Sequence, residues 1–396
     1  MNRIQKSAQS FELLVSETKE PVLDPESAVP DITETDYRIF SGIICIQLTP
    51  EELSRIINPV QTFPEQNTVL AVHWHPEYIP MELIRKRIEN TFPFKEKELI
   101  IPTQHNQLMT YDSVYHGVEV DCYSRGFKRK VQLLLHFKAD ASGKADILKS
   151  MLTHTFEYRS SQFFELLDTI VDPKWEDYLQ LAAEETGTGE KEVQFARIQT
   201  HKLYRLVREN EGTISRDFFK NKLLRDFVDQ QKQFYPMHFI NRVQVFIKAV
   251  KEIVKASFSL DYFYRTSEVI EEARSINAGI VVPHPEQFWP ILLCDYDIDG
   301  YEVWNPQSQE YTEFLINVIN RQNRSRSKSQ RPLLVFMGDD THMGEKIKEP
   351  TQIDAAKYYR EIGVQPAWDE LTIKKALIVG NFDRRKVLEE YLARLQ

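Results

Sequence analysis

The stretch Val72-His73-Trp74-His75-Pro76-Glu77 indicates both the fold and the chemistry of this sequence. It begins with the last residue of the β-branched, apolar run Thr68-Val69-Leu70-Ala71-Val72, which predicts a buried strand. Because alternate residues of a strand point to the same side, we expect His73 and His75 to face one point in space. Two imidazoles at the carboxyl end of a buried strand are well placed to hold a metal ion. An isolated His-x-His is at least as often structural, so the interpretation depends on similar stretches elsewhere.

Similar stretches do recur, because at several further points an apolar strand is followed by His, Glu or Asp. Imidazole and carboxylate together suit Zn²⁺, Mn²⁺ or Fe²⁺, and no thiolate is needed. Packing alone explains such a series poorly, since a buried histidine costs stability unless it has a partner. Beyond His73 and His75, the candidate ligands are His105, Glu119, His136, His284, Asp340 and His342.

The composition is that of a globular protein able to bury a sizeable core, with 42% hydrophobic and 28% charged residues among 396. A net charge of -9 gives no support for broad nucleic-acid binding. The three scattered cysteines argue against a disulfide framework and favour a reducing cytoplasm. The first 20 residues are charged throughout, and no apolar run reaches the roughly 20 residues of a membrane helix. We therefore expect a cytoplasmic protein without a signal peptide or a membrane partner.

Strand and helix patterns alternate in two separate parts of the chain, which predicts an α/β fold. Polar residues that collect just after strands indicate a barrel with its active site at the carboxyl face. Between these parts, apolar residues recur at helical spacing, which predicts a helical insertion. A further strand is predicted at residues 40–48. The expected divisions are an N-terminal extension (1–65, irregular to about residue 38), a metal-binding barrel (66–138 and 276–396) and a helical insertion (139–275).

The order of the stretches resembles the polymerase and histidinol phosphatase (PHP) superfamily of metal-dependent phosphoesterases. That family is similar in having His-x-His after its first barrel strand, a later Gly-Ile/Val-Glu-Ile/Val motif, and a closing Gly-Ser-Asp-x-His motif. The closing motif makes Asp340 rather than Asp339 the expected ligand. The matching stretches here are His73-Trp74-His75, Gln104-His105-Asn106, Gly117-Val118-Glu119-Val120, His136 on the next strand, Pro283-His284-Pro285, Gly300-Tyr301-Glu302-Val303-Trp304 and Gly338-Asp339-Asp340-Thr341-His342.

The resemblance implies a distorted TIM-like (β/α)7 barrel, and it does not cover the large helical insertion. We expect this insertion to sit over the barrel mouth and to select the substrate. The resemblance also implies a hydrolase that cleaves a phosphate ester by a metal-activated hydroxide, using two or three divalent ions of Mn, Zn or Fe. Glu119 would bridge two ions, and His284 or His342 would help to protonate the leaving group. Two departures matter, since Pro80 and Gln104 stand where the family has acids. Glu77 is the expected substitute ligand for the third ion, whose site stays open.

Several alternatives remain open at this stage. The substrate could be a phosphorylated small molecule, a nucleotide or a nucleic-acid end. The acids missing at Pro80 and Gln104 support a second hypothesis. In it, the chain is a catalytically impaired PHP-like module that binds metal and mediates interactions. A third is metal-dependent amide or ester hydrolysis. The basic cluster formed by Arg125, Lys128, Arg129 and Lys130 is either a phosphate clamp or a solvated turn.

Overall fold

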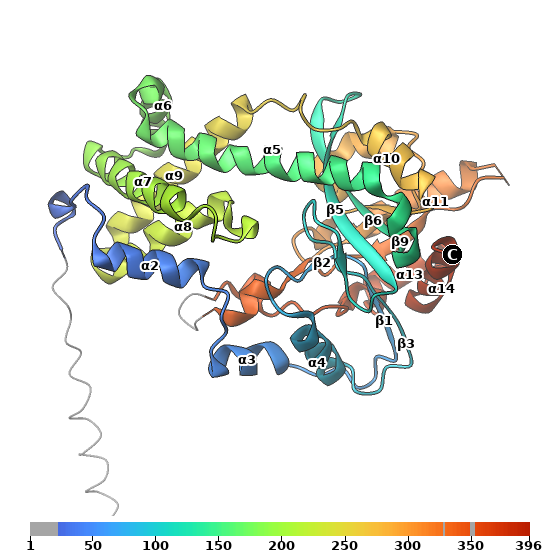
Figure 1. Ribbon diagram of the computed structural model, residues 1–396. Coiled ribbons are helices and arrows are strands. Elements are labelled where there is room, and N and C mark those ends of the chain that lie inside the picture. The colour runs from blue at the N-terminus through green and yellow to red at the C-terminus, as the bar shows by residue number, and fades with distance from the viewer. Residues whose placement is uncertain (1–22, 328, 349–352) are drawn as a thin grey trace, which may run out of the picture. The chain divides into compact units, whose positions relative to one another are not determined.

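Residues 23–327, 329–348 and 353–396 are described by the computed structural model shown in Figure 1. They fall into two units, each with its own core. The first unit takes in the described residues up to Cys45 together with Ser160–Phe258, and the second takes in Ile46–Arg159 together with Ser259–Gln396. The beginning of the sequence that was predicted to be irregular, residues 1–22, lies outside the described residues.

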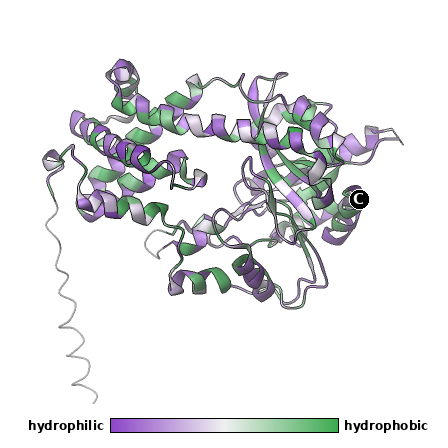
Figure 2. Cartoon of the chain, viewed as in Figure 1, coloured by the Kyte–Doolittle hydropathy of each residue, from purple (hydrophilic) through white to green (hydrophobic). Residues whose placement is uncertain are grey.

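The first unit is built from helices whose apolar faces pack on one another. Figure 2 shows hydrophobic and hydrophilic residues alternating along these helices, as expected of surface helices around a core. Buried aromatic residues such as Phe163, Phe195, Phe227 and Phe246 fill its centre. The helices are α2 (Glu34–Ile44), the later part of α5 (Asp146–Val171), α6 (Glu176–Thr186), α7 (Glu190–Asn210), α8 (Asn221–Asp229) and α9 (Met237–Ser257).

The strand predicted at residues 40–48 is wrong, because the first part of this segment belongs to helix α2. The helix begins at a capping box in which the Asp36 backbone N–H donates to Thr33 Oγ1 (3.2 Å) and the Thr33 N–H donates to Asp36 Oδ2 (2.8 Å). The buried Lys202 ammonium binds the same Asp36 carboxylate at 2.8 Å. These polar contacts at the helix start outweigh the β-branched character of the residues that follow.

The second unit contains a mixed six-stranded sheet in the order β4-β5-β6-β7-β8-β9. Neighbouring strands are antiparallel from β4 to β7 and parallel from β7 to β9. The strands are β4 (Met109–Thr110), β5 (Tyr115–Ser124), β6 (Arg129–Lys138), β7 (Gly279–Val282), β8 (Gly300–Trp304) and β9 (Leu334–Met337). Two short parallel pairs complete the strands, β1 (Thr68–Ala71) with β3 (Lys97–Ile100) and β2 (Trp74–His75) with β10 (Thr341–His342).

The mixed α/β class is as predicted, but the sheets of the described residues do not close into a barrel. A TIM-like barrel needs parallel neighbours, whereas β5 and β6 form a ten-residue antiparallel pair. Backbone hydrogen bonds between residues at the strand ends connect the three sheets instead. Asp340 N donates to His73 O (3.0 Å), Thr103 N donates to Trp74 O (2.9 Å), and Glu119 N donates to Gln104 O (3.1 Å). These bonds bring the strand ends that carry the candidate ligands to one place.

Helices α10 and α11 pack against the sheet of this unit, and α14 contacts β1, β3 and β9. Along β5, Val118, Val120 and Cys122 enter the apolar core, so the strand's pleat turns Glu119 and Asp121 to the other face. No helix within the described ranges is long and apolar enough to cross a membrane. The helices of this unit are α3 (Pro50–Ile57), α4 (Met81–Thr91), the start of α5, α10 (Thr266–Ser275), α11 (Thr312–Ser325), α12 (Ala355–Tyr358), α13 (Leu371–Val379) and α14 (Arg384–Arg394).

Candidate metal centre

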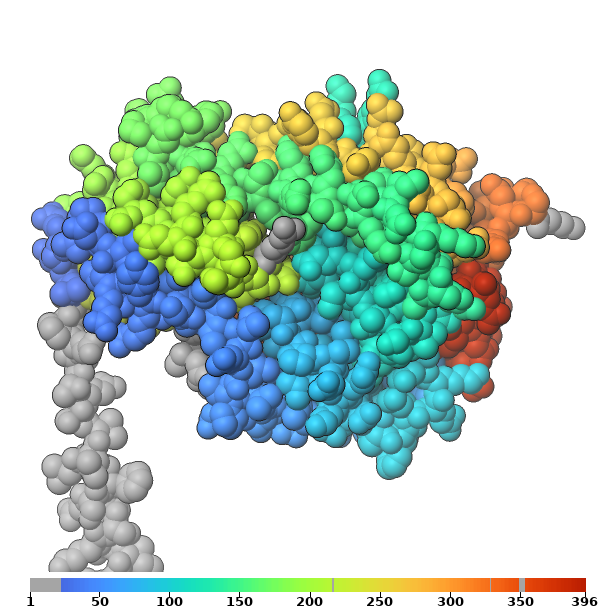
Figure 3. Space-filling view, in the orientation of Figure 1, coloured from blue at the N-terminus to red at the C-terminus, as the bar shows by residue number. Residues whose placement is uncertain are grey.

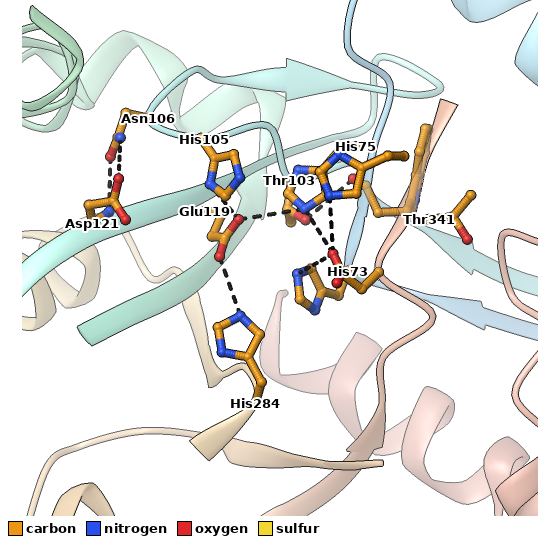
Figure 4. A network of polar contacts seen from close by, with 12 residues as sticks. His73, His75, Thr103, His105, Asn106, Glu119, Asp121, His284 and Thr341 are labelled. Carbon is orange, nitrogen blue, oxygen red and sulfur yellow. Dashed lines mark hydrogen bonds and ion pairs between the residues drawn. The ribbon is translucent and has the colours of Figure 1, made fainter. Parts of the chain in front are cut away.

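Six of the predicted ligands come together in the second unit as three overlapping triads (Figure 4). In each triad, one ligand atom from each residue lies within 4.8 Å of the others. His73, His75 and Glu119 each belong to two triads, so the cluster is continuous. The triads are His73 with His75 and Asp340, His73 with Glu119 and His284, and His75 with His105 and Glu119.

The local backbone explains how strand ends deliver these side chains. Trp74 is buried in an apolar cluster while His73 and His75 face the centre, as strand alternation predicts. Just beyond or within the ligand stretches, the chain turns sharply at residues with positive φ. Such conformations are uncommon for residues with side chains, and they persist where the surroundings enforce them. They are Glu77 (53°), Asn106 (55°), His284 (31°) and Asp340 (47°).

Glu119 lies at the middle of the cluster and is 1% exposed. Its Oε2 is 2.7 Å from His105 Nδ1 and 3.5 Å from His75 Nε2, and its Oε1 is 3.6 Å from His284 Nε2. Although His105 is near, Glu119 Oε2 has no aligned hydrogen-bond donor among the described residues. An unsatisfied carboxylate oxygen is costly in a buried place, and a cation between these groups would satisfy it.

Asp340 presents its two oxygens to different partners. Oδ1 lies 3.7 Å from His73 Nε2 and 3.4 Å from the Nε2 atoms of both His75 and His342. Oδ2 accepts hydrogen bonds from Gln307 Nε2 (3.1 Å) and from a terminal nitrogen of Arg360 (3.3 Å). One oxygen is therefore held in place while the other faces three imidazoles, which is the arrangement expected of a metal ligand with an orienting partner.

Glu302 orients His73 from behind. The His73 Nδ1–H donates to Glu302 Oε2 at 2.6 Å, and Glu302 Oε1 accepts from Asn305 Nδ2 at 3.0 Å. A Cβ at Gly338 would lie 1.9 Å from Glu302 Oε2, so only glycine leaves room for this carboxylate. A carboxylate that holds the far nitrogen of a ligating histidine is the usual outer partner of a metal site. Sequence reasoning gave Glu302 no role, although a lone acid in the fully buried strand β8 was the available signal.

A second buried acid, Asp121, fixes the loop that carries His105. Asn106 Nδ2 donates to Asp121 Oδ2 and the Asp121 N–H donates to Asn106 Oδ1, both at 2.9 Å (Figure 4). Lys130 and Arg159 each pair with this carboxylate at 2.7 Å. Burial alone would raise the pKa of Asp121, but these two cations hold it well below its usual range. The sequence pattern had not indicated a role for Asp121 either.

The protonation states of four central residues suit metal binding. His73 differs, because Glu302 outweighs burial and raises its pKa to about 10, so a metal ion must displace a proton from this ring. Burial lowers the pKa of His75 to about 3 and that of His105 to about 4, so both rings are neutral near pH 7. Burial would raise the pKa values of Glu119 and Asp340, but the neighbouring histidines hold both well below their usual range. Neutral imidazole and ionised carboxylate are the forms that coordinate a metal.

His342 and Glu77 form the outer edge of the cluster. The His342 Nδ1–H donates to Glu77 Oε1 at 3.2 Å, and the Gly344 N–H donates to Glu77 Oε2 at 2.8 Å. Burial lowers the pKa of His342, but hydrogen bonds to Asp340 and Glu77 outweigh it and raise this pKa to about 9. Neither residue belongs to a triad of the described residues. The structure thus places Glu77, predicted as a substitute ligand, as the partner that orients His342.

His136 was predicted as a ligand, and the structure corrects this prediction. Its Nδ1 lies 2.7 Å from Tyr391 Oη and its Nε2 lies 3.0 Å from Val72 O, so both ring nitrogens already have partners. The residue is fully buried and belongs to none of the triads. His136 is a hydrogen-bonded core histidine that ties β6 to the end of β1 and to α14.

We expect His136 to make stability pH-dependent. Burial lowers its pKa to about 3, below the unfolded value of about 6.5. The unfolded chain therefore binds a proton that the folded chain excludes, and the stabilisation present above about pH 6.5 is lost as pH falls toward 3. Between pH 6.5 and 5 this loss is about 2 kcal/mol. Urea unfolding in the presence of a chelator at several pH values gives the free energy of unfolding as a function of pH. The slope of this dependence should be smaller for His136→Gln than for the intact chain, by the equivalent of about one proton. An unchanged slope would contradict the assignment.

Comparisons with known proteins add little to this description. No family model matches the sequence, and no curated protein matches it. Among solved structures, the chain is similar to one from Bifidobacterium adolescentis ATCC 15703 that is described as a "putative metal-dependent phosphoesterase". The two are 16% identical, the alignment covers 80% of this chain and 98% of the other, and the TM-score is 0.42.

Proposed function

We propose that this chain is a metal-dependent phosphoesterase of the PHP type, which hydrolyses a phosphate ester of a small molecule, a nucleotide or a nucleic-acid end. The observation that carries the proposal is the set of three triads that share His73, His75 and Glu119. A donor set of imidazole and carboxylate without thiolate fits Zn, Mn or Fe, and the cluster offers places for two or three ions. The order of the sequence motifs supports the same reading.

The residues divide into a buried and an accessible set. The side chains of His73, His75 and Glu119 are 1% exposed, whereas those of His105, Asp340 and His342 are 20%, 13% and 31% exposed. We assign the buried set to holding the ions and the accessible edge to meeting the ester. Glu119 would be the shared ligand, because its two oxygens face different histidines.

When bound, the ions would supply an acidified water molecule and polarise the phosphoryl oxygens. His342 would protonate the leaving oxygen, because its raised pKa keeps it charged near pH 7 and Glu77 fixes its ring. His284, beside Glu119 and 6% exposed, is the alternative donor. Arg360, whose guanidinium already contacts Asp340, would place a further positive charge beside the phosphate.

The test compares ester classes on the purified full chain, with metal content measured by mass spectrometry. We expect hydrolysis of p-nitrophenyl phosphate or bis(p-nitrophenyl) phosphate that stops with chelator and returns with Mn²⁺ or Zn²⁺. We expect no matching turnover of p-nitrophenyl acetate or of an amino-acid p-nitroanilide. Bound metal without any phosphoester turnover would favour the interaction module. Chelator-sensitive cleavage of the acetate or anilide alone would favour ester or amide hydrolysis.

A further inference from the structure

The basic cluster noted in the sequence is divided by the structure into members with different surroundings. Lys130 is paired with the buried Asp121, and Arg129 is exposed. Arg125 and Lys128 are exposed as well, but they line an open cavity of about 650 Å³, together with the exposed Arg265 from another segment. Within the part of the chain that the structure describes, no ion-pair partner faces Arg125, Lys128 or Arg265. The cavity therefore has three cationic side chains at its wall that form no ion pair with the described residues.

The cavity lies within the second unit, between the end of the β5–β6 hairpin, helix α5, and the segment that leads into α10. In Figures 1 and 3 the teal hairpin end and the gold segment lie side by side at the top of the view. Backbone-directed bonds fix the walls. Tyr123 N donates to Tyr264 O at 2.8 Å, and the His154 Nε2–H donates to Tyr262 O at 2.9 Å. The cavity is thus formed before any ligand arrives.

Aromatic rings make up much of the remaining wall, from Tyr123, His154, Tyr262, Phe263 and Tyr264. The Tyr262 side chain is 61% exposed, so its ring is available to a ligand. The two acids of the wall are Asp261 and Glu268. Glu268 Oε2 accepts the Arg265 N–H at 2.8 Å, which engages this carboxylate at the start of α10. Three cations against two acids leave the wall net positive by one charge.

We infer that this cavity binds the phosphate and the base of a nucleotide. Guanidinium and ammonium groups without partners bind phosphate, and tyrosine rings stack on any base. The positive end of α10, at the same wall, adds to the attraction. Glu119, Asp121 and Tyr123 lie on one face of β5, so the cavity begins about 13 Å along the strand from the metal centre. A short single strand is long enough to span this distance. The inference rests on the proposed phosphoesterase function, and it narrows the proposed substrates to those that contain a nucleotide.

The test measures binding of a fluorescein-labelled single-stranded oligonucleotide to the full chain by anisotropy, with and without EDTA. Arg125→Glu combined with Lys128→Glu should weaken binding at least about tenfold, and Tyr262→Ala at least about fivefold. Arg129→Glu is the matched control, because this exposed neighbour lies outside the cavity wall, and it should change binding by less than about twofold. Turnover of p-nitrophenyl phosphate should be the same in all four proteins.

Competitors identify the ligand. If AMP binds more tightly than the oligonucleotide in competition, the ligand is a free nucleotide. If the oligonucleotide binds more tightly than AMP and its affinity falls with salt, the ligand is a strand. Either result supports the inference. The inference would be overturned if pyrophosphate competed as well as AMP and Tyr262→Ala had no effect on binding. Absence of binding would also overturn it, as would a loss of affinity in the Arg129→Glu control equal to that of the cavity variants. Binding with this variant pattern but without any phosphoester turnover would refute the proposed function and leave the cavity assignment standing.

Discussion

Asp340→Asn is expected to lower phosphoester hydrolysis by more than about 100-fold and to reduce the metal content of the purified chain. The reason lies in how the two oxygens of Asp340 are used. Gln307 and Arg360 both donate to Oδ2, so the carboxamide oxygen of asparagine would take that position. The amide NH₂ would then face the imidazoles of His73, His75 and His342, where it cannot ligate a cation. Metal analysis and turnover of the two proteins measure the effect.

Asp339→Asn is the matched control, with the same change of charge one residue earlier. Asp339 is buried, its Oδ2 accepts the Gly363 N–H at 2.9 Å and its Oδ1 accepts the Thr341 N–H at 3.2 Å. An amide can keep only one of these bonds, which should cost about 1–3 kcal/mol of unfolding free energy. Metal content should stay unchanged, because Asp339 belongs to none of the triads of the described residues. Equal metal loss in both variants would show that the closing motif has been placed in the wrong register.

The local elements of the second unit were largely predictable, because local chemistry decides them. The β-branched run before His73 forms β1, and the Thr49 capping pattern starts α3 with both reciprocal bonds in place. The pairing of most strands was harder to predict, because their partners lie far apart in the sequence. The β5–β6 hairpin is different, since the connection at residues 125–128 is too short for the crossover that parallel strands need. The expectation of a parallel barrel overlooked this short connection.

The grouping of the candidate ligands was predictable for residues at strand ends, and it was not predictable for residues whose surroundings depend on distant partners. His73 and His75 were recognised as candidates from their alternation along a strand, and Asp340 was recognised from its place before His342. His136 has the same signature, a histidine in an apolar strand, yet Tyr391 lies 255 residues away and satisfies it. Sequence alone cannot separate a ligand from a histidine with such a partner. Arg360, 20 residues beyond Asp340, was missed for the same reason.

His73→Ala combined with His75→Ala is expected to remove nearly all bound metal, because the pair takes at least one ligand from each of the three triads. A different pair of histidines provides the control. His105→Ala with His284→Ala breaks only the two triads that contain Glu119 and leaves the one formed by His73, His75 and Asp340 intact. Two variants with the same number of lost imidazoles should therefore differ in the ions that they keep.

Metal content measured by mass spectrometry after gel filtration decides between these outcomes, with circular dichroism as the check on folding. We expect the His73/His75 variant to retain almost no metal and the His105/His284 variant to retain about one ion per chain. Glu302→Gln weakens only the hydrogen bond between His73 Nδ1 and Glu302. Its metal content should lie between those of the intact chain and the double variants, with a metal affinity lower by about 10–100-fold. If the His73/His75 variant is folded and keeps its full metal content, the ions are held elsewhere and the centre built around His73 and His75 is not the metal site.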